Sequence, residues 1–189
     1  MSELANKIWW TKKTRIKTEK RLLNLNFYSQ FLVLWYSVFL AGYSVYSLVS
    51  PPDGPKESAI MTTLSISVMV ITIFISSMNF KGRSLLVKEC YEQLGLMYVK
   101  AKNKMSDDII LESEYKDILS MSENHVEKDF CCAVVEEYYS TKNKSLLSKH
   151  PTCQQYIYYW LYKIKNLIVI MFLFFLPVGI VMLLKGCSM

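Results

Sequence analysis

The sequence predicts an all-α membrane protein with a transmembrane helical hairpin, a cytosolic helical bundle and an additional C-terminal transmembrane helix. Three stretches of 31, 23 and 19 residues contain no Asp, Glu, Lys or Arg. A helix needs about 20 apolar residues to cross the hydrocarbon core of a bilayer. Elsewhere apolar residues recur at helical spacing, and the alternation typical of strands is not evident. A chain that is 52% hydrophobic is also too apolar to be disordered.

Each charge-free stretch contains one segment of the right length for a membrane span. These segments are residues 27–49, 59–78 and 167–184. The proline-rich turn at 51–55 breaks the helix between the first two segments, which predicts an antiparallel hairpin. The predicted organisation is a basic cytosolic arm (1–25), the hairpin (26–80), a cytosolic helical region (81–165), and a third transmembrane helix with a short tail (166–189).

The charges outside the spans predict the orientation. Residues 1–21 carry seven basic and two acidic side chains, whereas residues 81–165 carry 13 basic and 12 acidic ones. Basic residues beside a span mark its cytoplasmic side. We therefore expect a multi-pass protein of the cell inner membrane, with the N-terminus and residues 81–165 cytoplasmic and the C-terminus outside.

The cytosolic region is predicted to consist of several helices. The second span is expected to continue past Lys81 as one long helix, and further helices are expected to start at Ser106 and Ser122. A last helix after Pro151 should lead into the third span. The apolar stripe of the first cytosolic helix comprises Leu86, Cys90, Leu94, Met97 and Ala101.

The sequence offers no support for catalysis. The chain has two histidines, no G-x-S-x-G elbow, and glycines too scattered to form a phosphate-binding loop. The adjacent Cys131 and Cys132 lack the C-x-x-C spacing of zinc sites. We therefore expect no enzyme activity and no catalytic, cofactor or metal site.

The second span carries a polar face that pure lipid exposure would not require. Its members follow a 3-4-3-4-3 spacing and share one side of the helix: Thr62, Ser65, Met69, Thr72, Ser76 and Asn79. Small and hydroxylated residues pack helix interfaces in membranes. The same face could instead line a pore in a ring of identical copies. The absence of ionisable residues from the spans argues against proton-coupled transport.

The basic arm immediately before the first span is a second candidate site. Its residues are Lys12, Lys13, Arg15, Lys17, Lys20 and Arg21. Such a run attracts anionic lipid headgroups and can also bind an anionic ligand. Direct binding of nucleic acid is not expected.

The order of these segments matches a known pattern. The arm IWWTKKTRIKTEKRLL runs directly into the first span, and the second span leads into NFKGRSLLVKECYEQLGLMY. Over about the first 105 residues this resembles the SLATT family, the SMODS/SLOG-associating transmembrane effectors of bacterial conflict systems. The matching positions after the second span are Asn79, Phe80, Arg83, Cys90, Tyr91, Leu94 and Tyr98.

The resemblance implies a homo-oligomeric, pore-forming effector of antiphage defence that permeabilises or depolarises the cell's own membrane, as in abortive infection. It implies a pore role for the hairpin and a sensing or assembly role for the cytosolic helices. A nucleotide second-messenger system or a reverse transcriptase is the implied partner, and the chain resembles the reverse-transcriptase-associated subgroup. The third span departs from the family's two-span pattern. The alternative is a membrane-anchored adaptor that tethers or regulates such a partner.

Overall fold

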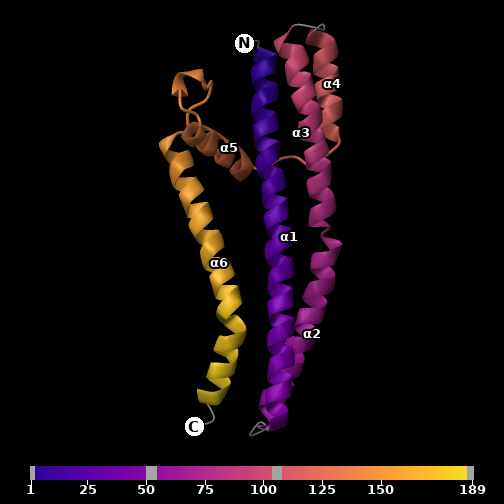
Figure 1. Ribbon diagram of the computed structural model, residues 1–189, viewed down its shortest axis with the longest axis vertical. Coiled ribbons are helices and arrows are strands. Elements are labelled where there is room, and N and C mark those ends of the chain that lie inside the picture. Colours follow the sequence, from indigo (N-terminus) through magenta and orange to yellow (C-terminus); the bar gives the residue numbers. More distant parts are fainter. Residues whose placement is uncertain (1–2, 50–54, 104–107, 187–189) are drawn as a thin grey trace. The chain divides into compact units, whose positions relative to one another are not determined.

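The computed structural model describes residues 3–49, 55–103 and 108–186. These residues form α-helices and one short 3-10 helix, without a strand, so the all-α prediction is confirmed (Figure 1). The predicted turn residues 51–54 and the helix start at Ser106 lie outside the described residues. The helices are α1 (Glu3–Val49), α2 (Pro55–Ser77), α3 (Phe80–Lys102), α4 (Asp108–Ser120), α5 (Glu127–Ser140), η1 (Lys144–Leu146) and α6 (Cys153–Gly186).

Among the described residues, three helical segments are long and apolar enough to cross a membrane. They are Glu3–Val49, Pro55–Lys102 and Cys153–Leu183. In the most apolar window of each segment, the share of residues buried within the described chain is only 0%, 6% and 6%, respectively. Apolar helices that expose their side chains in this way need lipid as their solvent. The protein is therefore a membrane protein.

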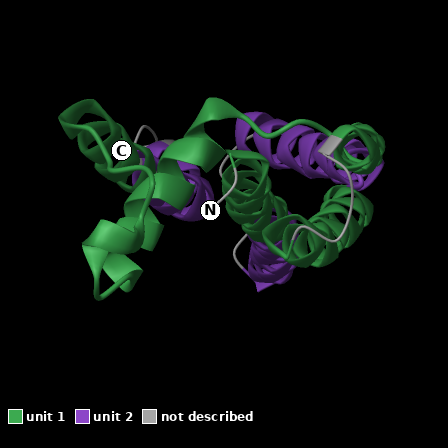
Figure 2. Cartoon of the chain, turned by 90° about the horizontal axis from the view of Figure 1, so that it is seen from above, with its two compact units in different colours: residues 1–25, 80–164 green, residues 26–79, 165–189 purple. Residues whose placement is uncertain are grey.

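The chain divides into two compact units (Figure 2). Residues 1–25 and 80–164 form one, which we call the head unit. Residues 26–79 and 165–189 form the other, which we call the span unit. Both units combine segments that are far apart in the sequence.

The head unit has a core built from three helices. Its buried members are Ala5 and Ile8 of α1, Cys90, Leu94, Met97 and Ala101 of α3, and Leu111, Tyr115 and Ile118 of α4. The predicted stripe of α3 is thus correct at four positions. It is wrong at Leu86, which is 51% exposed, because the buried face continues through Val87 and Ser84 instead.

The predicted continuous helix through the second span is wrong. The helix breaks between Ser77 and Phe80, and Asn79 has a φ of 43°. This left-handed conformation costs most residues free energy, but the short polar side chain of Asn tolerates it. The break separates α2 from α3.

The helix start predicted at Ser122 is also wrong. Residues 123–126 are irregular, and α5 begins at Glu127 after Val126 in an extended conformation. The Asp129 carboxylate accepts a hydrogen bond from the Val126 amide at 3.4 Å, which favours the helix start at this later position.

In the span unit, α1 is tied to α6 at a proline. Pro177 has no N–H, so the carbonyl of Leu173, four residues earlier, lacks its helical partner. The hydroxyl of Tyr36 donates to this carbonyl at 2.8 Å. Beside it, Trp35 Nε1 donates to the carbonyl of Phe174 at 2.9 Å, and the two rings stack with centroids 4.5 Å apart. Donors from α1 therefore satisfy backbone acceptors of α6 that water cannot reach in a bilayer.

Candidate functional site

The polar face of α2 is exposed along its whole length. Met61 is buried in the span unit, and Leu64, Val68 and Ile75 are half-buried. Successive residues are rotated by about 100° around a helix. Thr62, Ser65, Met69 and Ser76 each come one residue after one of these four, so they point to a different side of α2. Every member of the predicted face is exposed: Thr62, Ser65, Met69, Thr72, Ser76 and Asn79. Packing within one chain therefore does not cover this face.

The hydroxyl groups on this face bond to their own helix. Thr62 donates to the carbonyl of Ser58 at 2.8 Å, Ser65 to Met61 at 3.0 Å, and Thr72 to Val68 at 2.7 Å. Such bonds satisfy the donor without a partner helix and leave the oxygen able to accept from outside. The face can thus pack against another copy or contact water, and between Glu57 and Lys81 it carries no charge.

The basic arm packs inside the head unit, mostly against α5. Lys13 pairs with Glu137 at 2.7 Å, and Lys17 pairs with Glu136 at 2.7 Å. The remaining basic residues are placed differently: Lys12 lies beside Gly95 of α3, Arg15 is fully buried, Lys20 is exposed, and Arg21 pairs with Asp129 at 2.9 Å. Three of these six charges therefore have acidic partners within the head unit.

Asp129 is the most densely bonded carboxylate of the head unit. It is 3% exposed and accepts a hydrogen bond from Thr18 at 2.9 Å. The guanidinium of Arg21 donates to both of its oxygens, from Nε at 2.9 and 3.2 Å and from Nη2 at 3.1 Å. With the Val126 amide, these contacts join α1 to the start of α5.

Glu136 connects α1, α5 and α6. One of its oxygens accepts from Lys17, and the other accepts from the hydroxyl of Tyr159 at 3.2 Å. Lys163 lies 3.9 Å away. Burial raises the pKa of Glu136, whereas the hydrogen bond and charge of Lys17 and the charge of Lys163 lower it. The lowering effects together outweigh burial, so the pKa falls below its usual value.

The motif that follows the second span serves packing in the head unit. Cys90 and Leu94 are fully buried, and the Cys90 thiol lies 3.4 Å from the carbonyl of Ile118 on α4. Arg83 donates through Nε to Glu123 at 2.8 Å, and its guanidinium lies 5.9 Å from the centroid of the Phe80 ring.

The other motif positions also hold α3 in place. Burial, followed by the charge and hydrogen bond of Glu19 on α1, raises the pKa of Tyr91 to about 12. Tyr98 packs against the core of the head unit, and Asn79 occupies the break before α3. The motif therefore fixes α3 against α1, α4 and the segment before α5.

A family model connects this architecture with known proteins. The model described as SMODS and SLOG-associating 2TM effector domain family 5 matches residues 1–183. The chain belongs to this family. The match shows a membrane effector domain of the kind associated with SMODS and SLOG defence systems. No curated protein and no solved structure matches the chain.

The family match extends further than the resemblance drawn from the first 105 residues. It includes most of α6, so the third apolar helix lies inside the matched region rather than beyond it. The contacts of Tyr36 and Trp35 with Leu173 and Phe174 fit this extent, because they tie the part of α6 after residue 164 to the hairpin within the span unit.

Sequence reasoning missed the burial of Arg15. Ile8, Arg15 and Leu22 are spaced by seven residues, and all three are fully buried. A seven-residue repeat places side chains on nearly the same side of a helix. The seven-residue spacing from Ile8 and Leu22 could have indicated that Arg15 is buried. Because Arg15 lies within a run of basic residues, it was interpreted as part of an exposed arm.

Proposed function

We propose that this chain is a defence effector that assembles into a homo-oligomer and permeabilises the inner membrane. In this proposal α2 lines the pore with Thr62, Ser65, Thr72 and Ser76. The head unit, on the cytoplasmic side, keeps the assembly closed until a signal is sensed. The family match establishes a membrane effector domain. We propose in addition that it forms a homo-oligomer, that it opens a pore and that its head unit lies on the cytoplasmic side.

The exposed polar face of α2 is the observation that carries the proposal. A lipid-facing surface favours apolar side chains, and the neighbouring exposed positions of α2, Ile66, Ile73 and Phe74, fit that rule. The polar face of α2 does not follow this rule. Association of several copies would remove these hydroxyls from lipid and would place them at helix contacts or against water.

The test replaces the hydroxyl groups of this face with apolar side chains. The triple variant Ser65→Leu, Thr72→Leu, Ser76→Leu should abolish depolarisation of cells that produce the protein, as measured with a potential-sensitive dye. Protein in the membrane fraction is quantified in parallel. Unchanged depolarisation at equal protein levels would contradict the pore proposal.

A matched control is available on the same helix. Thr63, Ser67 and Ser77 are also one threonine and two serines, and they lie off the polar face. Replacing these three with Leu makes the same change in composition and hydropathy. The control variant should depolarise cells like the unsubstituted protein.

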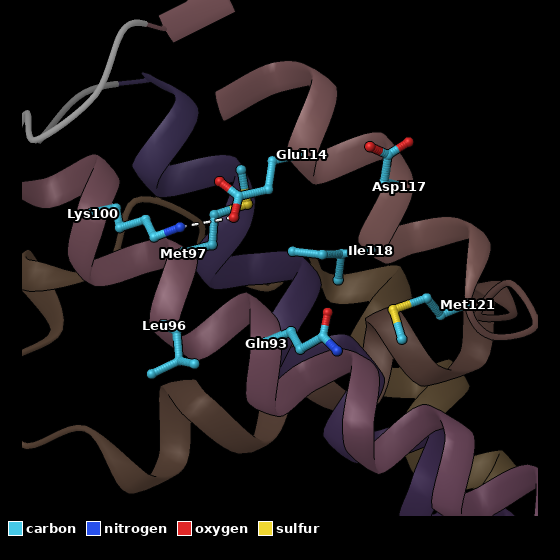
Figure 3. A pocket seen from close by; sticks show the side chains of 8 residues that line it. All are labelled: Gln93, Leu96, Met97, Lys100, Glu114, Asp117, Ile118 and Met121. Carbon is cyan, nitrogen blue, oxygen red and sulfur yellow. Dashed lines mark hydrogen bonds and ion pairs between the residues drawn. The ribbon is translucent and has the colours of Figure 1, made fainter. Parts of the chain in front are cut away.

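The alternative is an adaptor that binds a partner protein through the head unit. It is favoured by a groove of about 510 Å³ between α3 and α4, which Figure 3 shows with the Lys100–Glu114 ion pair at one end. Leu96, at 71% exposed, and Met121, at 39%, give the groove an apolar lining. A reverse transcriptase or a nucleotide-signal synthase encoded nearby is the partner implied by the resemblance.

The two functions predict different results for one substitution. Leu96→Glu places a charge in the groove and should abolish recovery of the partner in a pull-down if the chain is an adaptor. A pore effector produced alone should still collapse the membrane potential with this substitution. Recovery of a partner without any effect on the potential would favour the adaptor.

A further inference from the structure

Arg15 has the largest fully buried side chain among the described residues. Its Nη2 donates to Asn124 Oδ1 at 3.4 Å, close to the limit for a hydrogen bond. Within the described chain, its Nε and Nη1 atoms have no hydrogen-bond partner. Arg remains protonated in proteins, and an unpaired charge away from water is strongly unfavourable. The guanidinium therefore calls for a compensating group.

Two carboxylates close to this region pair with other cations: Asp129 pairs with Arg21, and Glu123 pairs with Arg83. Arg15 itself has no ion pair among the described residues. Elsewhere on the arm two partly exposed cations have acidic partners, in the pairs Lys13–Glu137 and Lys17–Glu136. The most deeply buried cation of the arm is thus without an anion in the described chain.

Arg15 contacts the irregular connection between α4 and α5. Residues 123–126, between α4 and α5, have no helical structure. Asn124 contacts the guanidinium and is itself exposed, as is His125. In the same connection the Ser122 hydroxyl is buried and has no hydrogen-bond partner in the described chain. This connection therefore carries both an exposed side chain in contact with Arg15 and a buried hydroxyl without a partner.

We propose that Arg15 binds an oxyanion of the phosphate class, held beneath the segment 122–126 with the Ser122 hydroxyl as a further donor. The planar guanidinium presents donors that match two oxygens of such a group, and charge-assisted bonds of this kind are strong. The oxyanion would replace the long contact with Asn124 and would supply the missing negative charge. The site is in the head unit and does not depend on pore formation by α2.

The full-length protein in maltoside micelles, which contain no phosphate, allows a direct test. Inorganic phosphate is titrated against sodium chloride at equal ionic strength, and the histidine ring signals are followed by NMR. The chain has two histidines, so His150 is an internal reference for His125. Partial desolvation of the ring and then the charge of Arg15 lower the pKa of His125. A bound anion should therefore shift the His125 signals and raise this pKa.

The expected result is a saturable shift of His125, with no shift of His150. Arg15→Met should weaken phosphate binding at least about tenfold, because it removes charge-assisted hydrogen bonds. Lys20→Met, which removes an exposed charge from the same helix, should bind like the unsubstituted protein. Should Arg15→Met fail to fold, Ser122→Ala takes its place and should bind about threefold to tenfold more weakly.

A second titration with short-chain phosphatidic acid identifies the source of the oxyanion. An Arg15-dependent shift with the lipid alone assigns the site to a lipid headgroup, whereas a shift with inorganic phosphate assigns it to a soluble phosphate. Both results support the proposed chemistry. It is overturned if neither titrant moves His125, or if Arg15→Met and the unsubstituted protein respond equally.

Discussion

The head unit and the span unit differ in how many of their polar groups bond to distant side chains. In the head unit, distant side chains bond to each other, as in the contacts of Asp129 with Thr18 and Arg21. In the span unit, hydroxyls such as those of Ser37 and Thr72 bond to the backbone of their own helix. The head unit is thus stabilised by tertiary contacts within one chain, whereas much of the span unit depends on its surroundings.

Burial shows the same contrast. Leu94 of the head unit has no exposed surface, whereas Leu34 of the span unit is 62% exposed. Exposed leucines on a transmembrane helix are solvated by lipid, but the exposed hydroxyl face of α2 has no comparable partner there. This difference supports assembly through α2, and substitutions in the two units should have correspondingly different effects.

The largest effect is expected from Asp129→Asn. This substitution removes the carboxylate but leaves Arg21 nearly buried, so the head unit should lose about 3–5 kcal/mol of stability. Denaturant unfolding in micelles, followed by hydrogen exchange at the amides of α5, measures the loss. The control Glu112→Gln removes an exposed pair with Lys7 at 4.0 Å and should cost less than about 1 kcal/mol. Equal effects of the two substitutions would contradict the assigned role of Asp129.

A second test truncates one leucine in each unit. Leu94→Ala leaves a cavity in the head-unit core and should cost about 2–5 kcal/mol. Leu34→Ala should change stability by no more than about 0.5 kcal/mol, because its side chain is exposed within the chain. The same unfolding measurement serves both variants. A large cost for Leu34→Ala would show that this position is packed against another copy.

A smaller effect is expected where α1 meets α6. Tyr36→Phe removes the donor to the carbonyl of Leu173 and should cost about 0.6–1.7 kcal/mol, the range found for hydrogen bonds between membrane helices. Pro177→Ala restores the helical N–H that this carbonyl lacks. In the Pro177→Ala background, Tyr36→Phe should therefore cost less, as a double-mutant cycle would measure. Strict additivity would disprove the coupling.

The smallest effect concerns pH. The pKa of Glu136 is lowered in the folded protein, so its contribution to stability is present above the unfolded-state pKa, near 4.5. That contribution is lost as the pH falls through the lower, folded value. Glu136→Gln should thus weaken the acid dependence of head-unit stability below about pH 4.5. An unchanged pH profile in this variant would exclude Glu136 as a contributor.

The membrane helices could be predicted from the sequence, because charge-free apolar runs of this length are rarely compatible with any structure other than a transmembrane helix. It also located most of the α3 core, since Cys90, Leu94, Met97 and Ala101 repeat at helical spacing. Its errors were local. The break at Asn79 depends on one backbone conformation, and the late start of α5 depends on the Val126 amide contact with Asp129.

The two candidate sites were predictable to different extents. The α2 face could be predicted because its spacing is regular within one helix. The contacts of the basic arm could not be predicted, because Lys13, Lys17 and Arg21 pair with residues of α5 that are more than 100 positions away in the sequence. Long-range pairing of this kind leaves no local periodicity, so a run of basic residues is indistinguishable from a solvated face.

Conductance across a planar bilayer, before and after a charged thiol reagent, tests the central claim most directly. Thr72→Cys places a thiol on the proposed pore-lining face, and Ile73→Cys places one on the adjacent lipid-facing position. The unsubstituted protein, with its own five cysteines, provides the baseline. If α2 lines a pore, the reagent should change the conductance of Thr72→Cys well beyond this baseline and leave Ile73→Cys at the baseline. Equal responses of the two variants, or no conductance from any of the three proteins, would contradict a pore lined by α2.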